Sequence, residues 1–339
     1  MMLLAIICLI QLVIQVTLPY YHGNKLYWEK ISFFEEQGEY NAVCFGSSRM
    51  YRQVDPERLN HTMRDIKLFN FGVTGAFNPE SYFLFENFID DLDSGQIKLA
   101  ILELQDLDTL VETEIKTVRS SYWNKDLLYA INYINDDGFH SMKRSKALRQ
   151  YIIGYVYGLT NFSKISAFEH FLGVQKSRGK DGFYSLDNQM ADSHSPGLAR
   201  RSLALRDSLI VNARKAVAAF PQDNADVMKA NKTHLKKLCH LIDKSEKKGI
   251  ELYFVIAPKL TSYQALRAIE KSIPNRVINL GSYFEYPEFY SIENSFDIKH
   301  LNGQGLKMFT DALARKVHEL RGKRKISINN LTSDTCVTL

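Results

Sequence analysis

The sequence predicts an α/β fold, a three-layer sandwich in which a mostly parallel sheet lies between two layers of helices. Short, fully apolar runs at 42–45, 99–102 and 252–256 are typical of strands that are covered on both faces. These runs alternate with longer segments of helical pattern, as in successive strand–helix–strand units. The chain has 339 residues, of which 45% are hydrophobic. This is enough for one α/β domain with a large insertion, or for two domains.

The expected elements follow one another from about residue 42. Strands are expected at 42–45, 67–73, 99–102, 252–256 and 276–280. Helices are expected from Pro79 to about 95, and at 226–248, 262–271 and 306–320. Gly249 stands where a helix commonly ends.

Residues of about 111–223 do not fit this alternation and are expected to form a helical insertion between the two halves of the sheet. Helical stretches are expected at 125–135 and 141–157, followed by a polar, turn-rich stretch at 176–197. Several tyrosines of the insertion either line a carbohydrate groove or pack in a helical core: Tyr122, Tyr129, Tyr133, Tyr151, Tyr155 and Tyr157. The polar residues 322–339 are expected to form a disordered tail.

The N-terminal residues 1–18 carry no charged side chain and are followed by Pro19. A run of this length just suffices to cross the hydrocarbon core of a membrane. No basic residue precedes the run and no small-x-small cleavage site ends it. An uncleaved anchor at 1–19 is therefore favoured over a cleaved signal peptide or a buried helix. Aromatic residues just after a span often lie at the membrane interface, so the aromatic residues between charges that follow predict a linker at 20–40 and a main domain that spans 41–321.

Charge and cysteine usage exclude several classes of site. The net charge is only +5, and no clustered basic face with interleaved aromatic residues predicts nucleic acid as a partner. None of the four cysteines, Cys8, Cys44, Cys239 and Cys336, lies in a Cys-x-x-Cys pair or in a zinc-ligand spacing. We therefore expect no metal and no cofactor. We also expect buried free thiols rather than a disulfide framework.

Candidate catalytic residues gather where the predicted strands end, which is where parallel sheets bind ligands. Gly46-Ser47-Ser48-Arg49 follows the first strand, and Asp297-Ile298-Lys299-His300 lies between the last strand and the last helix. A serine hydroxyl needs an imidazole base, and that base needs an orienting carboxylate. Among nine histidines, His300 alone combines a nearby acid with a loop at this edge. The hypothesis is therefore a triad of Ser48, His300 and Asp297, although each motif alone also fits a turn or a helix cap.

Taken together, the order and placement of these segments resemble the SGNH (GDSL-type) hydrolases. Residues 43–49 resemble the first block of that family, whose Gly-Asp-Ser carries the nucleophile at its third position. This position corresponds to Ser48, with a serine in place of the Asp. Residues 70–75 resemble the second block, whose last glycine corresponds to Gly75. Residues 297–302 resemble the fifth block, which supplies the acid and the base.

The resemblance covers about 40–108 and 225–321 and implies a flavodoxin-like SGNH fold. Its oxyanion donors correspond to the backbone N–H groups of Ser48 and Gly75. The third block departs from the family, because Leu107 stands where the family has an Asn that completes the oxyanion hole.

Three further residues are candidates for substrate binding. Gln105 either replaces the missing Asn or faces a helix. Arg49 either binds a carboxylate near the site or forms a structural salt bridge. Lys259, just after the strand that ends at Pro258, lies at the active edge, and a solvated lysine is the alternative.

The resemblance implies acyl transfer through a Ser48-acyl intermediate, by an esterase or O-acyltransferase that acts on an acylated carbohydrate or polysaccharide. A looser likeness to SGNH-like proteins of teichoic-acid D-alanylation and alginate O-acetylation implies a role in the cell envelope. The enzyme would then be anchored through residues 1–18, with its catalytic domain on the periplasmic side or the cell surface and with envelope-assembly partners.

Two alternatives stay open. The first is a non-catalytic SGNH-like protein that binds a glycan or scaffolds polysaccharide assembly, which Leu107 supports. The second is a periplasmic lipase or thioesterase, which would need a deep apolar pocket for the acyl chain.

Overall fold

The computed structural model describes residues 25–107, 125–136, 179–193, 196–204, 230–259 and 264–328, together with a few residues of 5–13 and 144–152. Its strands are β1 (Ala42–Phe45), β2 (Leu68–Asn70), β3 (Leu99–Glu103), β4 (Glu251–Ile256) and β5 (Val277–Asn279). They form one sheet in the order β2-β1-β3-β4-β5, and all neighbouring pairs are parallel. This order is that of flavodoxin-like, doubly wound sheets. The prediction of a parallel sheet is confirmed.

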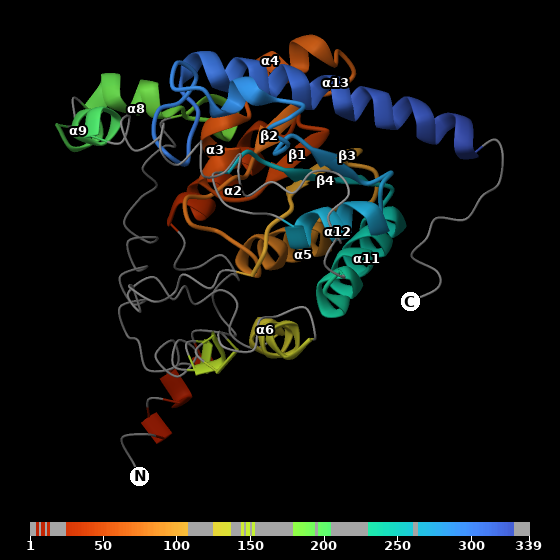
Figure 1. Cartoon of the computed structure of the whole chain (residues 1–339). Coiled ribbons are helices and arrows are strands. Elements are labelled where there is room, and N and C mark those ends of the chain that lie inside the picture. The colour runs from red at the N-terminus through yellow and green to blue at the C-terminus, as the bar shows by residue number, and fades with distance from the viewer. Residues whose placement is uncertain are drawn as a thin grey trace.

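The α-helices are α2 (Lys25–Gln37), α3 (Ser48–Gln53), α4 (Pro56–Thr62), α5 (Glu80–Asp91), α6 (Lys125–Asn135), α8 (Leu186–Ser193), α9 (Pro196–Ala204), α11 (Lys232–Lys247), α12 (Gln264–Ser272) and α13 (Gly303–Ile328). Two short 3-10 helices are η4 (Lys180–Gly182) and η5 (Pro287–Tyr290). In Figure 1, α3, α4 and α13 lie on one face of the sheet, and α2, α5, α11 and α12 lie on the other. The sheet is therefore covered on both faces, as its apolar strands require.

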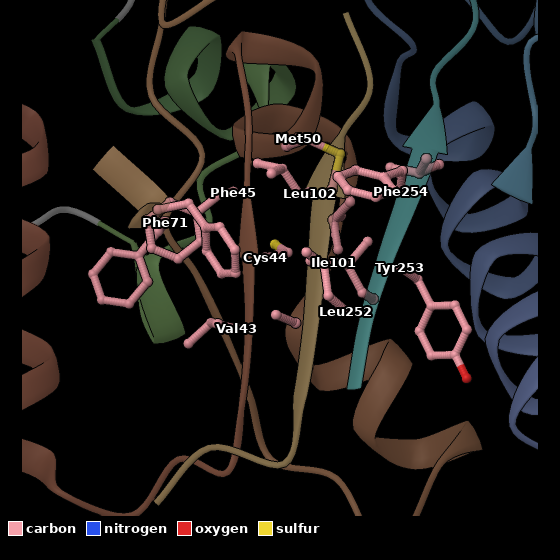
Figure 2. Packing of buried hydrophobic residues seen from close by; sticks show 14 of the residues in the cluster. Val43, Cys44, Phe45, Met50, Phe71, Ile101, Leu102, Leu252, Tyr253 and Phe254 are labelled. Carbon is pink, nitrogen blue, oxygen red and sulfur yellow. The ribbon is translucent and has the colours of Figure 1, made fainter. Parts of the chain in front are cut away.

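The core forms where the central strands meet these helix layers. Val43, Ile101 and Leu252 lie on neighbouring strands and are fully buried (Figure 2). Next to them, the ring of Phe71 lies 4.9 Å from that of Phe45 and 4.8 Å from that of Phe88 on α5, measured between ring centroids. These contacts fix the sheet against its helices and so fix the edge at which the strands end.

The predicted linker at 20–40 is wrong for most of its length, because α2 is part of the domain. Its side chains Tyr27, Ile31 and Phe34 are buried in the main hydrophobic cluster. These positions are spaced by four and three residues, so they share one face of the helix. The aromatic residues that suggested a membrane interface pack against the sheet instead.

The predicted tail at 322–339 is also wrong at its beginning, because α13 continues to Ile328. Three of the seven residues of this extension are lysine or arginine, and both favour helix. Residues 329–339 lie outside the described residues.

The insertion docks on the domain through the parts of it that the structure describes. Leu107 packs with Tyr133 and other apolar residues around α6, so this tyrosine belongs to a helical core. Residues 179–193 fold against the edge of the sheet, where the Tyr40 hydroxyl donates to Asp181 at 2.7 Å. The stretch expected to be turn-rich therefore contains helices α8 and the beginning of α9. Apart from a few residues of 144–152, the remainder of 111–223 lies outside the described residues.

Cys239 is disulfide-bonded, whereas Cys8 and Cys44 are free. The expectation of free thiols was therefore wrong for Cys239, since disulfide partners need proximity in space and not in sequence. Cys44 is buried in β1 as expected.

Across the described residues, no helix has both the length and the apolar character that a membrane crossing needs. The predicted anchor at 1–18 lies mostly outside those residues.

Candidate active site

Ser48 stands at the first position of α3, immediately beyond the carboxyl end of β1. Gly46 has φ +153°, and a Cβ there would lie 2.6 Å from the Cβ of Glu103, so only glycine lets the chain pass β3 this closely. Ser47 then caps the helix, because its Oγ accepts the Arg49 N–H at 3.2 Å. This local structure leaves Ser48 half-buried at the edge of the sheet.

Glu103, at the end of β3, accepts hydrogen bonds from the residues before and after Ser48. Its side chain is fully buried, its Oε2 accepts the Ser47 N–H at 2.7 Å, and its Oε1 accepts Arg49 Nε at 2.7 Å. Arg49 thus forms the salt bridge that was one of its two expected roles. Glu103 was not among the site residues predicted from the sequence. The available signal was a carboxylate at the end of an otherwise apolar strand.

Asp297 and His300 form a compact, buried turn. Asp297 Oδ1 accepts the backbone N–H groups of Lys299 at 2.7 Å and His300 at 3.0 Å. The same carboxylate lies 2.9 Å and 3.1 Å from His300 Nδ1 through its two oxygens. A proton on Nδ1 directed at this carboxylate leaves Nε2 as an acceptor.

His300 Nε2 lies 2.8 Å from Ser48 Oγ, across 252 residues of sequence. The structure therefore brings the three predicted residues into one chain of hydrogen bonds, from Ser48 through His300 to Asp297. The topology allows this meeting: β1 lies inside the sheet between β2 and β3, and the Asp297–His300 turn follows β5 just before α13, which packs against α3.

Gly75 lies in a loop that runs beside the end of β1. Phe71 N–H donates to Cys44 O at 2.7 Å, and Val73 N–H donates to Gly46 O at 2.8 Å, so the loop is held parallel to the nucleophile segment. Gly75 itself adopts φ +76°. Within the described part of the chain, its N–H group has no hydrogen-bond partner, and neither has the N–H group of Ser48. Both predicted oxyanion donors are thus available.

Lys30 stabilises the loop at 70–75 through hydrogen bonds to two of its carbonyl groups. Its fully buried Nζ donates to Asn70 O at 2.9 Å and to Gly72 O at 2.6 Å, and it lies 3.9 Å from the centroid of the Tyr51 ring on α3. Burial lowers the pKa of Lys30 well below its ordinary value. Lys30 was not predicted as part of the site, because it lies in the segment that was expected to be a linker.

The segment after β3, which corresponds to the third block, has Leu107 where the resemblance calls for an Asn. Leu107 has no side-chain amide group, and it is buried against α6. Gln105 faces a helix, which was the second of its two expected roles. Its Oε1 accepts a weak hydrogen bond from Ser81 Oγ of α5 at 3.5 Å. Its Nε2 is buried without a hydrogen-bond partner. Asn78 lies beside this segment, paired with Leu107 in an isolated parallel bridge.

A small pocket opens beside His300. Its lining consists of Gln53, Pro258, Lys259, Phe289, Tyr290, Ser295, Asp297, Ile298, Lys299, His300 and Leu301. Lys259 therefore borders the site as expected, and its Nζ lies 3.3 Å from Asp106 Oδ2. Its partly buried ion pair brings a positive charge to the rim of the pocket.

Among the side chains that the structure describes, no group of three or more His, Cys, Asp or Glu residues could hold a metal ion. No family model matches the chain, and no curated protein matches it.

Proposed function

We propose that this protein is an SGNH-type serine esterase or O-acyltransferase. The observation that carries the proposal is the hydrogen-bonded series of Ser48, His300 and Asp297, with distances of 2.8 Å and 2.9 Å. These distances lie within the reach that a general base needs. The flavodoxin-like strand order supports an SGNH-type fold, with Ser48 after β1 and His300 just before α13.

In the first half of the reaction, His300 Nε2 removes the Ser48 hydroxyl proton while Oγ attacks the carbonyl carbon of an ester. The N–H groups of Ser48 and Gly75 stabilise the oxyanion, and Asp297 stabilises the imidazolium. The bond to the alcohol oxygen then breaks, and His300 returns the proton to that oxygen. In the second half, water or a sugar hydroxyl attacks the acyl-Ser48 ester, and His300 accepts and returns its proton in the same way.

The proposed substrate is an acylated carbohydrate or polysaccharide of the cell envelope. The small size of the pocket, about 20 Å³, argues against the long apolar chain that a lipase accepts, and Gln53, Lys259 and Lys299 add polar groups to its otherwise largely apolar lining. The uncharged residues 1–18 would anchor the enzyme in a membrane, with the catalytic domain outside the cytoplasm.

The test compares the wild type with Ser48→Ala and His300→Ala in hydrolysis of p-nitrophenyl acetate and in labelling by a fluorophosphonate. We expect each variant to lose about 10³-fold or more in kcat, because the nucleophile and its base act as a unit. Ser193→Ala and His318→Ala, at exposed positions of α8 and α13, serve as matched controls and should keep wild-type activity.

A folded wild type that neither hydrolyses the ester nor reacts with the probe would overturn the proposal. That outcome would favour the non-catalytic glycan-binding or scaffold protein, which the apolar Leu107 at the third segment also supports.

A further inference from the structure

Arg49 has unused hydrogen-bond donors next to the nucleophile. It directly follows Ser48, and its guanidinium is engaged only through Nε, which donates to Glu103 Oε1 at 2.7 Å. Within the described part of the chain, its two terminal nitrogens have no hydrogen-bond partner. The side chain is only 15% exposed. Neither nitrogen is among the buried unpaired atoms of the described residues, so both are accessible to a bound group.

The guanidinium is held in a fixed orientation. The carboxylate of Glu103 is tied on its other oxygen to the Ser47 N–H at 2.7 Å, and Glu103 is itself fully buried at the end of β3. One carboxylate thus ties the residue before Ser48 to the residue after it. Since guanidinium is planar and its N–H groups form a rigid fork, fixing Nε also fixes where the terminal nitrogens lie.

The segment that follows Glu103, the partner of Arg49, is also the one from which the proposed oxyanion hole lacks a side-chain donor. The segment after β3 offers Leu107, which packs against α6, and Gln105, whose amide oxygen is turned toward α5. Two backbone N–H groups, of Ser48 and Gly75, are the other donors at the site. A single oxyanion donor is typically worth about 10²- to 10³-fold in rate.

We infer that a terminal nitrogen of Arg49 donates a hydrogen bond to the oxyanion that forms when Ser48 attacks an ester, an inference that rests on the proposed function. Arg49 is then a catalytic residue, and Glu103 is the residue that positions it. Arg49 keeps all its protons throughout the reaction. When the bond to the leaving alcohol breaks, the electron pair of the oxyanion re-forms the carbonyl double bond, and His300 protonates the alcohol oxygen.

The test uses p-nitrophenyl acetate and its thiono analogue, in which sulfur replaces the carbonyl oxygen. Sulfur is a weak hydrogen-bond acceptor, so an oxyanion donor contributes much less to the thionoester reaction. We expect Arg49→Met to lower kcat/KM for the oxygen ester by about 10²- to 10³-fold, mostly through kcat, and to affect the thionoester far less. Arg58→Met is the matched control, because it removes a surface arginine that pairs with Asp311, and both rates should stay at wild-type values.

Arg49→Lys is a control for a folding defect in Arg49→Met, because it keeps a cation for Glu103 but removes the guanidinium fork. We expect the oxygen-to-thiono rate ratio to fall in this variant too. An equal loss for both esters in Arg49→Met and Arg49→Lys would show that Arg49 only positions Ser48, which would overturn the inference while leaving the proposed function intact. If the folded wild type had no activity on either ester and did not react with the fluorophosphonate, the proposed function itself would be overturned.

Discussion

At the residue scale, the segment around Ser48 depends on one buried carboxylate. Burying a charge is expensive unless it is paired and hydrogen-bonded. Glu103 meets this condition, because one oxygen accepts the Ser47 N–H and the other accepts Arg49 Nε. The arrangement is specific to carboxylate, since an amide in its place would present an oxygen to only one of the two donors.

Replacing Glu103 by Gln should therefore destabilise the protein by about 2–4 kcal/mol, because it leaves the partly buried Arg49 without its counter-charge. Urea unfolding followed by circular dichroism measures this change. Asp311→Asn breaks the more exposed pair with Arg58 and should cost less than about 1 kcal/mol. Equal costs for the two variants would mean that the burial of Glu103 has no energetic consequence.

At the element scale, the strands were predictable and α2 was not. The strands β1, β3 and β4 can be recognised from the local sequence, because continuous hydrophobic runs are typical of strands in a sheet that is covered on both faces. The aromatic residues of α2 fit a membrane interface and a protein core equally well. What decides between them is the contact of Phe34 with Phe69 and Phe88, residues that lie far away in the sequence. No local pattern contains that information.

Lys30 of α2 binds the carbonyl groups of Asn70 and Gly72, and its burial there predicts that the stability of the fold depends on pH. Burial lowers its pKa below the ordinary value of 10.5, with the Cys44 thiol and the Arg52 guanidinium as the titratable groups that act on it. Between the lowered pKa and 10.5, the unfolded chain binds more protons than the folded one, so the folded state gains stability as the pH rises. At lower pH the penalty for burying the charge is fully present.

We therefore expect the free energy of unfolding of the wild type to rise with pH toward 10.5, relative to that of Lys30→Met. Urea titrations of both proteins at several alkaline pH values give this difference. Lys67→Met removes a lysine that pairs with Glu39 at the surface, and its difference from the wild type should vary less with pH. A pH-independent difference for Lys30→Met would contradict the expectation.

At the scale of the whole molecule, the triad was predictable but the docking of the insertion was not. Ser48 and His300 could be matched because one rule connects them: the carboxyl ends of parallel strands share an edge. No comparable rule connects Arg52 with Tyr184, or Asn231 with Tyr133, although these pairs hold the insertion to the domain through hydrogen bonds of 2.8 Å and 2.9 Å. The same limit applies to the disulfide of Cys239.

The junction of α5, α6 and α11 should be sensitive to acid through His234. This histidine is buried, and its Nε2 lies 3.1 Å from the Tyr82 hydroxyl. Its ring centroid lies 5.3 Å from that of Tyr133 on α6. Burial lowers the pKa of His234 to about 4 from 6.5, although the charge of Asp106 opposes the shift. Between these values the unfolded chain binds more protons, so the folded state loses stability as the pH falls.

The loss should approach about 3 kcal/mol once the pH reaches the pKa of folded His234. Urea unfolding between about pH 7 and about pH 4.5 would follow it. We expect His234→Phe to be less stable at neutral pH, because it loses the bond to Tyr82, but to lose less stability than the wild type as the pH falls. His318→Phe, at an exposed position of α13, should retain the acid response of the wild type. If His234→Phe lost stability as steeply as the wild type, the acid response would have to arise at other groups, and a neutral His234 would not be what keeps α6 docked.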